Sequence, residues 1–408
     1  MIEFIKRFTP YIDQMLVSGG SFLTIAICAH KLALAEQGKL AYVLALYVVT
    51  LLIQGSLIHT WAAVQFPRRN NQHRYQQSLV LLSIVLAILS STMICAAMYW
   101  LAISAGWAAT TKTLFLLFVF LLLQQLVDFS RKAAYYAHSQ EMALRISSTM
   151  YPLRIVLLLV DTVSTINDVL LILIISCVLP LMFMRYLSVK RVYPLKQLIR
   201  LSRQHINGAS QLGITAIINW LWYNAPVFFL GALHGVEAVA VVTSLRSVSN
   251  LFNVVLEVLE TSFAAKLAKA YAATSSWREL VRKEYMNGLS LWLVGLVFMV
   301  LMHDAIVPIA LGLKFVEYGH LMIIFWVAQV FTFLSRIEGV KLRTMGGAKL
   351  ITLGNLCAFI LVLLIGWPMI RRYGVNGAAY LSICSPLAVY VGQFVGHKFK
   401  WKAEINAK

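Results

Sequence analysis

Residues 78–104 read SLVLLSIVLAILSSTMICAAMYWLAIS, a run without a single charged side chain. A helix needs about 20 consecutive apolar residues to cross a bilayer, so this segment is long enough to span one. Eleven more apolar runs lie at 10–33, 40–63, 108–129, 146–164, 166–187, 209–233, 237–262, 287–312, 319–337, 350–370 and 375–396. The sequence therefore predicts an all-α polytopic membrane protein with about 12 transmembrane helices.

The overall composition excludes a soluble enzyme. Of the 408 residues, 60% are hydrophobic and 12% are charged, and the mean hydropathy is +0.77. The charged share is about half that of soluble domains, and one soluble core cannot bury so many apolar side chains.

The basic residues predict the topology. The chain has 35 Lys and Arg against 16 Asp and Glu, a net charge of +19. About 27 of the basic residues fall at the N-terminus, in the even-numbered connections and in the tail, and about six fall in the odd-numbered connections. Cytoplasmic loops carry such an excess, so both termini are predicted to be cytoplasmic. Because topology explains the charge, no nucleic-acid partner is expected.

The longest connection divides the twelve runs into six and six. It covers 188–208, is basic and amphipathic, and is expected to lie along the inner membrane surface. The predicted organisation is an N-terminal six-helix lobe over 1–187, this linker, a C-terminal six-helix lobe over 209–396 and a cytoplasmic basic tail over 397–408. Two six-helix halves joined in this way are typical of a duplicated transporter.

The eighth run carries a stripe of polar side chains. Arg246, Asn250, Asn253, Glu257 and Glu260 follow one another at steps of three or four, which places them on one face of a helix. Charged side chains are costly inside a membrane, so a stripe of five favours a wet cavity over simple pairing between helices. Arg246 and the two asparagines are predicted to bind substrate.

Other runs add candidate substrate-binding residues. Arg154 follows Tyr151 by three positions in the fifth run, near mid-depth, and Asn219 precedes Tyr223 by four in the seventh. Arginine binds phosphate oxygens with a bidentate fork and stays charged at any accessible pH. Two arginines, one in each half and facing a shared cavity, therefore predict an anionic, phosphorylated substrate.

Three carboxylates are candidates for ion coupling, namely Glu257 and Glu260 near the cytoplasmic end of the eighth run and Asp13 at the start of the first. A proton and a sodium ion both stay open as the coupled ion. For the two glutamates, the alternative is ion pairing with loop cations, Lys266 and Lys269.

The sequence carries no signature of a cofactor, a metal site or an enzyme. The five cysteines all fall inside apolar runs without CxxC spacing, and no histidines are grouped as metal ligands. No glycine-rich phosphate loop precedes a lysine, and no long outer loop carries paired catalytic groups. We therefore expect no catalytic residues, no metal and no cofactor.

Several stretches resemble the polysaccharide, or O-antigen, flippases of the multidrug/oligosaccharidyl-lipid/polysaccharide exporter superfamily. They are IDQMLVSGGSFLTIAICAHKLALAEQGKLA at 12–41, LHGVEAVAVVTSLRSVSNLFNVVLEVLETSFAAKLAKAY at 233–271, ALGLKFVEYGHLMIIFWVAQ at 310–329, GVKLRTMGGAK at 339–349 and YGVNGAAYLSI at 373–383. The similarity runs over almost the whole length of the chain.

This resemblance implies two six-helix lobes around a central cavity, which work by alternating access in the bacterial inner membrane. It implies transfer of an undecaprenyl-pyrophosphate-linked oligosaccharide between leaflets, for surface polysaccharide or O-antigen assembly with polymerase or ligase machinery. Relatives' cationic cavity residues correspond in kind to Arg154 and Arg246. Membrane lipid is the other expected partner.

Two other function classes stay open. A cation-coupled multidrug antiporter of the same superfamily would want cavity carboxylates without matching arginines, and Glu257 could serve that role. A membrane-embedded glycosyltransferase or ligase would need a sizeable outer loop, whereas the longest outer connection here is about a dozen residues.

Overall fold

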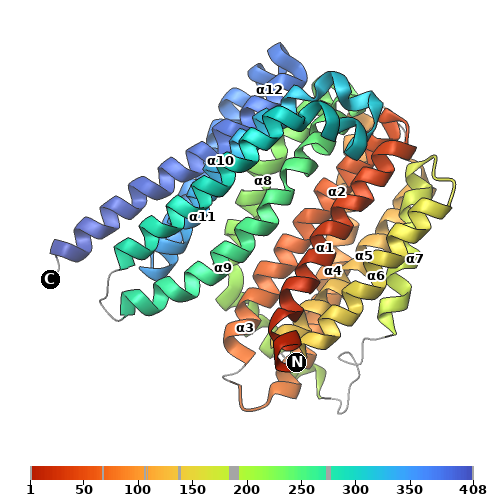
Figure 1. The fold of residues 1–408 in the computed structure, drawn as a ribbon. Helices are drawn as coiled ribbons and strands as arrows, with labels where there is room; N and C mark the ends of the chain where they lie inside the picture. Colours follow the sequence, from red (N-terminus) through yellow and green to blue (C-terminus); the bar gives the residue numbers. More distant parts are fainter. Residues whose placement is uncertain are drawn as a thin grey trace. The chain divides into compact units, whose positions relative to one another are not determined.

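The computed structural model describes residues 2–66, 69–104, 107, 109–136, 139–182, 193–272 and 277–406. Within these helices, the side chains of 2–8, 104, 254, 255, 257–259, 261, 262, 265, 272, 348 and 400–406 lie outside the description. The described chain consists of helices joined by short connections, with no strand in it (Figure 1).

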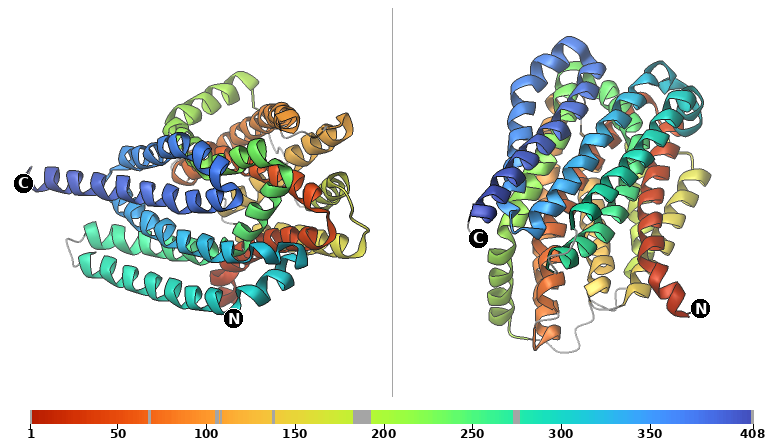
Figure 2. Two further views of the ribbon diagram at one scale, coloured as in Figure 1. Left: turned by 90° about the horizontal axis from the view of Figure 1, so that it is seen from above. Right: turned by 60° about the vertical axis from the view of Figure 1, so that its left-hand side comes forward.

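The chain divides into an N-terminal unit, Met1–Trp220, and a C-terminal unit, Leu221–Lys408. The N-terminal unit contains α1 (Ile2–Lys31), α2 (Leu34–Gln54), the π-helix η1 (Gly55–Thr60), α3 (Trp61–Gln65), α4 (Gln72–Ser104), α5 (Thr111–Tyr136), α6 (Gln140–Val160), α7 (Ile166–Leu181) and the first part of α8 (Leu195–Ser249). The C-terminal unit contains the rest of α8, then α9 (Leu251–Ala272), α10 (Trp277–Leu311), the 3-10 helix η4 (Leu313–Tyr318), α11 (His320–Thr344) and α12 (Ala348–Asn406). Figure 2 shows these helices from two further directions.

The predicted all-α membrane fold is confirmed. Nine helical stretches in the described residues are long and apolar enough to cross a membrane. Two of these, Leu195–Asn253 and Lys349–Phe399, each contain a glycine bend and so cover two predicted runs. The sixth run contains the shorter helix Ile166–Leu181, so the described residues of every predicted run include a helix. The chain is a multi-pass membrane protein.

Two glycines join consecutive crossings of the C-terminal unit without a loop. Gly235 interrupts α8 with φ of 82°, and Gly374 interrupts α12 with φ of 56°. Residues other than glycine rarely adopt these backbone angles. The two bends lie together, because His234 Nε2 is 2.9 Å from the carbonyl oxygen of Ile370 and its ring lies beside Gly374. The contact between the two bends therefore joins the two pairs of membrane-crossing helices at the end where each pair turns.

The first part of α8 packs against η1, α3 and α4 of the N-terminal unit. His205 Nε2 lies 2.7 Å from the carbonyl oxygen of Leu57 in η1, and its Nδ1 lies 2.6 Å from the Tyr75 hydroxyl. Gly208 admits the Trp61 indole, because a Cβ there would lie 2.6 Å from a ring carbon. These contacts explain why the unit boundary falls at Trp220, beyond residues 193–208, which are the described part of the predicted linker.

In the C-terminal unit, α10 and α11 approach closely at small residues. A Cβ on Gly288 would lie 2.0 Å from Phe333, and one on Gly295 would lie 2.0 Å from Trp326. Trp292 and Trp326 each donate an indole N–H to the other's carbonyl oxygen, at 3.0 and 3.1 Å. Buried indole N–H groups need a partner, so this reciprocal pair fixes the two helices in register.

Candidate functional site

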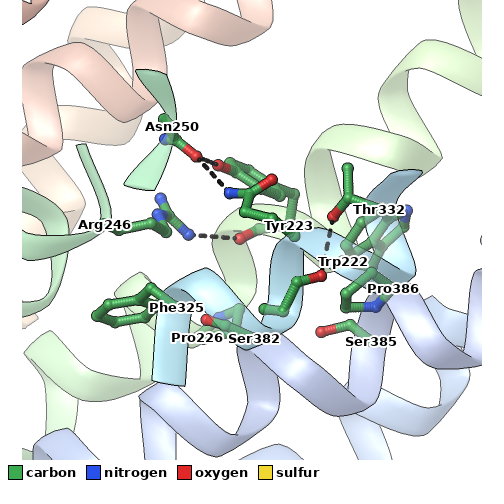
Figure 3. Close-up of a pocket in the computed structure, with 12 residues that line it drawn as sticks. Trp222, Tyr223, Pro226, Arg246, Asn250, Phe325, Thr332, Ser382, Ser385 and Pro386 are labelled. Atoms are coloured by element: carbon green, nitrogen blue, oxygen red, sulfur yellow. Dashed lines mark hydrogen bonds between the residues drawn. The ribbon is translucent and has the colours of Figure 1, made fainter. Parts of the chain in front are cut away.

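A small pocket in the C-terminal unit contains the arginine of the eighth run. Its walls come from α8, α11 and α12, together with the residue between α8 and α9 (Figure 3). The lining residues are Trp222, Tyr223, Pro226, Arg246, Asn250, Phe325, Ala328, Gln329, Thr332, Ser382, Ser385 and Pro386. The described lining residues therefore combine one cation with neutral polar and aromatic side chains, and none of them is a carboxylate.

Arg246 is half-buried, and Tyr223 is the residue that holds it in the part of the chain that the structure describes. One guanidinium nitrogen donates to the carbonyl oxygen of Tyr223 at 3.1 Å, and the guanidinium carbon lies 4.4 Å from the centre of the Tyr223 ring. Such a stacking contact is a cation–π interaction. No carboxylate oxygen among the described side chains lies within the 4.0 Å of an ion pair to Arg246. The described part of the chain therefore gives this cation no counter-ion.

Asn250 joins the elements around this pocket. It lies at the one-residue interruption between α8 and α9, and its Oδ1 accepts hydrogen bonds from three side chains. The donors are the Tyr223 hydroxyl at 3.2 Å, Asn253 Nδ2 at 3.1 Å and Gln329 Nε2 at 3.3 Å. Figure 3 shows Arg246 and Asn250 both directed toward Tyr223. The structure thus brings four predicted substrate-binding residues together.

The polar stripe continues along α9 to a pair of arginines on α11. Asn253 Oδ1 accepts a hydrogen bond from Arg336 at 3.4 Å, and Arg336 forms an ion pair with Glu260 at 3.2 Å. Arg343 forms a second ion pair with Glu260. The cations that the sequence suggested as partners were different ones, Lys266 and Lys269.

Of the two other predicted residues, one does not line the pocket and one has a side chain that the structure does not describe. Asn219 is half-buried on α8, just before the unit boundary, and does not line the pocket. Glu257 is in α9, and its side chain lies outside the described residues.

The other predicted arginine is enclosed within the N-terminal unit. Arg154 is 6% exposed and donates to Ser176 Oγ at 3.1 Å and to Gln124 Oε1 at 2.8 Å. Its guanidinium also lies over the ring of Tyr151, which is itself buried, at 5.3 Å. Its hydrogen-bond partners among the described residues are all neutral, and Gln124 in turn donates to Asp128 at 3.4 Å.

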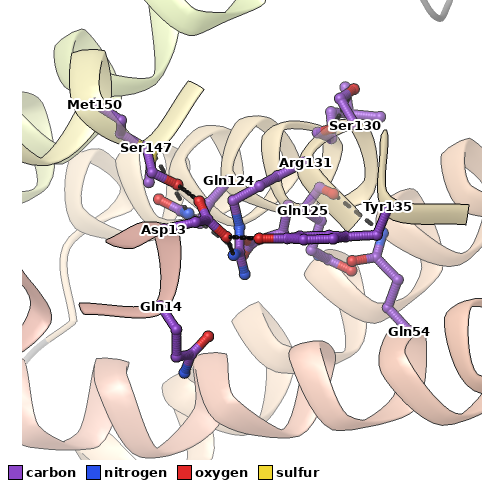
Figure 4. A network of polar contacts seen from close by, with 12 residues as sticks. Asp13, Gln14, Gln54, Gln124, Gln125, Ser130, Arg131, Tyr135, Ser147 and Met150 are labelled. Carbon is purple, nitrogen blue, oxygen red and sulfur yellow. Dashed lines mark hydrogen bonds and ion pairs between the residues drawn. The ribbon is translucent and has the colours of Figure 1, made fainter. Parts of the chain in front are cut away.

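Asp13 is the centre of a buried network next to Arg154. Its carboxylate is 1% exposed and accepts from Arg131 at 2.7 Å, and also from Tyr135 and Ser147 (Figure 4). Arg131 also forms an ion pair with Asp128 at 3.7 Å. Through Gln124 the network reaches Arg154, so two arginines and two aspartates, with no net formal charge, share one buried region.

Sequence reasoning missed the residues that α11 contributes. Gln329, Arg336 and Arg343 are seven positions apart, and all three contact the polar stripe of α8 and α9. A seven-residue repeat keeps side chains on one face of a helix, so this spacing was a signal that could have found them.

No model of a known protein family matches the chain, and no curated protein matches it in sequence. Several solved structures match its fold. An inward-facing multidrug resistance MATE family transporter of the MOP superfamily has a TM-score of 0.71 at 15% identity, over 97% of this chain and 95% of that one. The lipid II flippase MurJ, in an inward closed conformation, has a TM-score of 0.67 at 11% identity, over 97% and 87%.

A third match is a MOP superfamily transporter from Pyrococcus furiosus, with a TM-score of 0.58 at 13% identity, over 99% of this chain and 93% of that one. It is described as having a binding pocket of reverse polarity that suggests a different function. The three likenesses confirm the predicted fold. Pocket polarity therefore differs among proteins of this fold. The cargo has to be inferred from the side chains of the pocket and not from the fold.

Proposed function

We propose that this protein is a transporter that moves a lipid-linked oligosaccharide with a pyrophosphate head across the bacterial inner membrane. The proposed cargo is an undecaprenyl-pyrophosphate-linked oligosaccharide, which enters from the cytoplasmic leaflet and leaves to the outer leaflet by alternating access. Polymerase or ligase machinery for surface polysaccharide would then consume it. Both termini are proposed to be cytoplasmic.

The single observation that carries this proposal is Arg246 in a pocket whose described lining residues include no carboxylate. A half-buried cation without a counter-ion favours an anion from solution. Its guanidinium has five N–H donors, and among the described residues it donates to the Tyr223 carbonyl alone. The remaining donors suit two phosphate oxygens, and the amide of Gln329 and the hydroxyl of Ser382 lie in the same lining.

The role of Arg154 in the proposal is indirect. Gln124 and Ser176 already occupy its guanidinium, and it is nearly inaccessible. We therefore assign Arg154 and the adjacent Tyr151 to positioning the network around Asp13, and keep the half-buried Asn219 as a candidate substrate contact.

Ion coupling is assigned to the carboxylates Asp13, Glu257 and Glu260, with a proton or a sodium ion as the coupled ion. Asp13 is held by Arg131 and two hydroxyl groups, so a bound cation would have to displace Arg131. Glu260 is similarly held by Arg336 and Arg343. The test is transport into vesicles under an imposed pH or sodium gradient, and equal gradient dependence in Glu257→Gln would remove Glu257 from the assignment.

A multidrug antiporter is the second candidate, and one observation favours it. The aromatic rings of Trp222, Tyr223 and Phe325 line the pocket, and such rings bind organic cations. Arg246 opposes this reading, because it would repel a cationic drug at the same place.

The two candidates are separated by one set of variants. In cells that depend on this protein for surface polysaccharide, Arg246→Gln should lower polysaccharide at least about tenfold, and Arg246→Lys should retain part of it. The control is Arg371→Gln, which removes the same charge from an exposed position. Membrane abundance is measured in all strains.

Normal polysaccharide in Arg246→Gln would contradict the phosphate assignment. If the same variant instead raised the export of a cationic dye, the antiporter would become the better function.

A further inference from the structure

A second cavity lies in the N-terminal unit, where the connection from α3 to α4 meets the beginning of α8. Its volume is about 290 Å³, and it is lined by Arg69, Asn70, Asn71, Arg74, Tyr75 and Leu201. The lining has two guanidinium groups and two amides and contains no carboxylate. The proposed transport function uses none of these residues.

Neutral neighbours hold both arginines in place. The guanidinium of Arg69 stacks on the Tyr75 ring at 5.2 Å, and its buried Nε has no hydrogen-bond partner among the described residues. Arg74 donates to the side-chain oxygen of Gln197 at 3.2 Å. The Tyr75 ring is fixed in turn by the 2.6 Å contact of its hydroxyl with His205. Two cations five positions apart in the sequence thus line one cavity, with donors left over for an anion.

The same cavity adjoins the N-terminus of the long helix α4. Asn71 caps this helix, since its Oδ1 accepts from the backbone N–H of Arg74 at 3.0 Å. A helix N-terminus carries a partial positive charge that attracts anions. Here it adds to the field of the two arginines, and phosphate is the anion whose geometry guanidinium groups match best.

The surroundings of the cavity indicate where such a phosphate would come from. Leu195 and Ile199, in the first turns of α8, are 60% and 53% exposed, although both are apolar. Lys196 and Arg200 are exposed on the same turns. An exposed apolar and basic helix start, next to the end of the membrane-crossing helix α4, is typical of a segment lying in the headgroup region.

We propose that this cavity binds the phosphate group of an anionic phospholipid from the leaflet that contacts the start of α4. The headgroup phosphate would lie between Arg69 and Arg74, and the acyl chains would run past Leu195 and Ile199. Because Leu201 and Gln197 belong to the first part of α8 and the arginines to the α3–α4 region, a bound lipid would fasten these two parts of the N-terminal unit to each other. Anionic lipid would therefore raise the stability of the folded protein.

The test uses the full chain, purified in a neutral detergent. Phosphatidylglycerol, phosphatidylcholine or inorganic phosphate is titrated in, while the unfolding temperature and lipid retention in native mass spectrometry are measured. The variant pair Arg69→Gln/Arg74→Gln removes both guanidinium groups. The matched control, Arg200→Gln/Arg203→Gln, removes two exposed arginines from the neighbouring turns of α8.

We expect phosphatidylglycerol to raise the unfolding temperature of the wild type more than phosphatidylcholine does. The first pair should weaken phosphatidylglycerol binding at least about tenfold, and the control pair less than about threefold. Should the first pair fail to fold, Arg69→Lys/Arg74→Lys keeps the charge, and it should bind phosphatidylglycerol more weakly than the wild type because the bidentate fork is lost.

Three results would overturn the proposal. One is equal binding of phosphatidylglycerol and phosphatidylcholine by the wild type. Another is an equal loss of phosphatidylglycerol binding in the test pair and the control pair, which would mean that the lipid responds to general surface charge. The third is that inorganic phosphate stabilises the protein and phosphatidylglycerol does not, which would mean that the bound phosphate does not come from a lipid. None of these results depends on transport activity, so the proposed function is tested separately.

Discussion

Replacing Asp13 with asparagine should strongly destabilise the N-terminal unit. The carboxylate is 1% exposed and lies 2.7 Å from an Arg131 nitrogen, so the substitution leaves Arg131 with only Asp128, at 3.7 Å. The buried network then carries a net charge of +1 instead of zero. Removing one partner of a buried ion pair costs about 3–5 kcal/mol, so we expect a loss in that range.

Equilibrium unfolding of the purified protein in mixed micelles, followed by far-ultraviolet circular dichroism, measures this loss. The control is Asp304→Asn, whose side chain is 85% exposed and which should change the unfolding free energy by less than about 0.5 kcal/mol. The double variant Asp13→Asn/Arg131→Gln restores a neutral network. It should be more stable than the sum of the two single losses predicts, by about 0.5–3 kcal/mol.

The reasoning fails if Asp13→Asn unfolds within about 1 kcal/mol of the wild type, or if the two single losses simply add in the double variant. Either result would mean that the charges of this network are not coupled in the folded protein. Transport measured on the same variants is a separate readout, because ion coupling at Asp13 could be lost while the fold is retained.

Three further substitutions test the backbone and the helix contacts. Gly235→Ala should lower the free energy of unfolding by about 1–3 kcal/mol through backbone strain alone, since a Cβ there meets nothing within 4 Å. Gly19 is equally open but has no positive φ, so Gly19→Ala should be neutral or stabilising in the same unfolding measurement. Gly295→Ala should lower the free energy of unfolding by about 1–3 kcal/mol, because its Cβ would lie 2.0 Å from a carbon of the Trp326 indole. A crystal structure of the variant with that indole unmoved would contradict this prediction. His205→Phe leaves the Leu57 carbonyl without its side-chain partner and should cost about 1–3 kcal/mol, with faster hydrogen exchange across η1 as the local readout.

The number and positions of the crossings could be predicted from the sequence because length and hydropathy alone determine them. The stripe from Arg246 to Asn253 could be predicted for a similar reason. Helical periodicity places residues three and four apart on one face, and here the interruption at Asn250 is too short to break that face. The Tyr223 hydroxyl on α8 lies beside this stripe, at 3.2 Å from Asn250.

Partners on distant helices could not be predicted. Glu260 pairs with Arg336 and Arg343, 76 and 83 residues further along the chain, and nothing in the local spacing of α9 selects them over nearby lysines. Arg154 illustrates the same limit. Its depth and charge are visible in the sequence, but only the packing of α5 and α7 places Gln124 and Ser176 around its guanidinium.

The glycine bends of α8 and α12 have a practical consequence for anyone mapping this protein in cells. Each bend passes from one crossing to the next with a single non-helical residue, Gly235 or Gly374. An epitope tag or a protease site inserted there would have to unwind the flanking turns, so such reporters would disturb what they are meant to locate. Single cysteines at neighbouring exposed positions, labelled with a reagent that cannot cross membranes, would report sidedness without lengthening the chain.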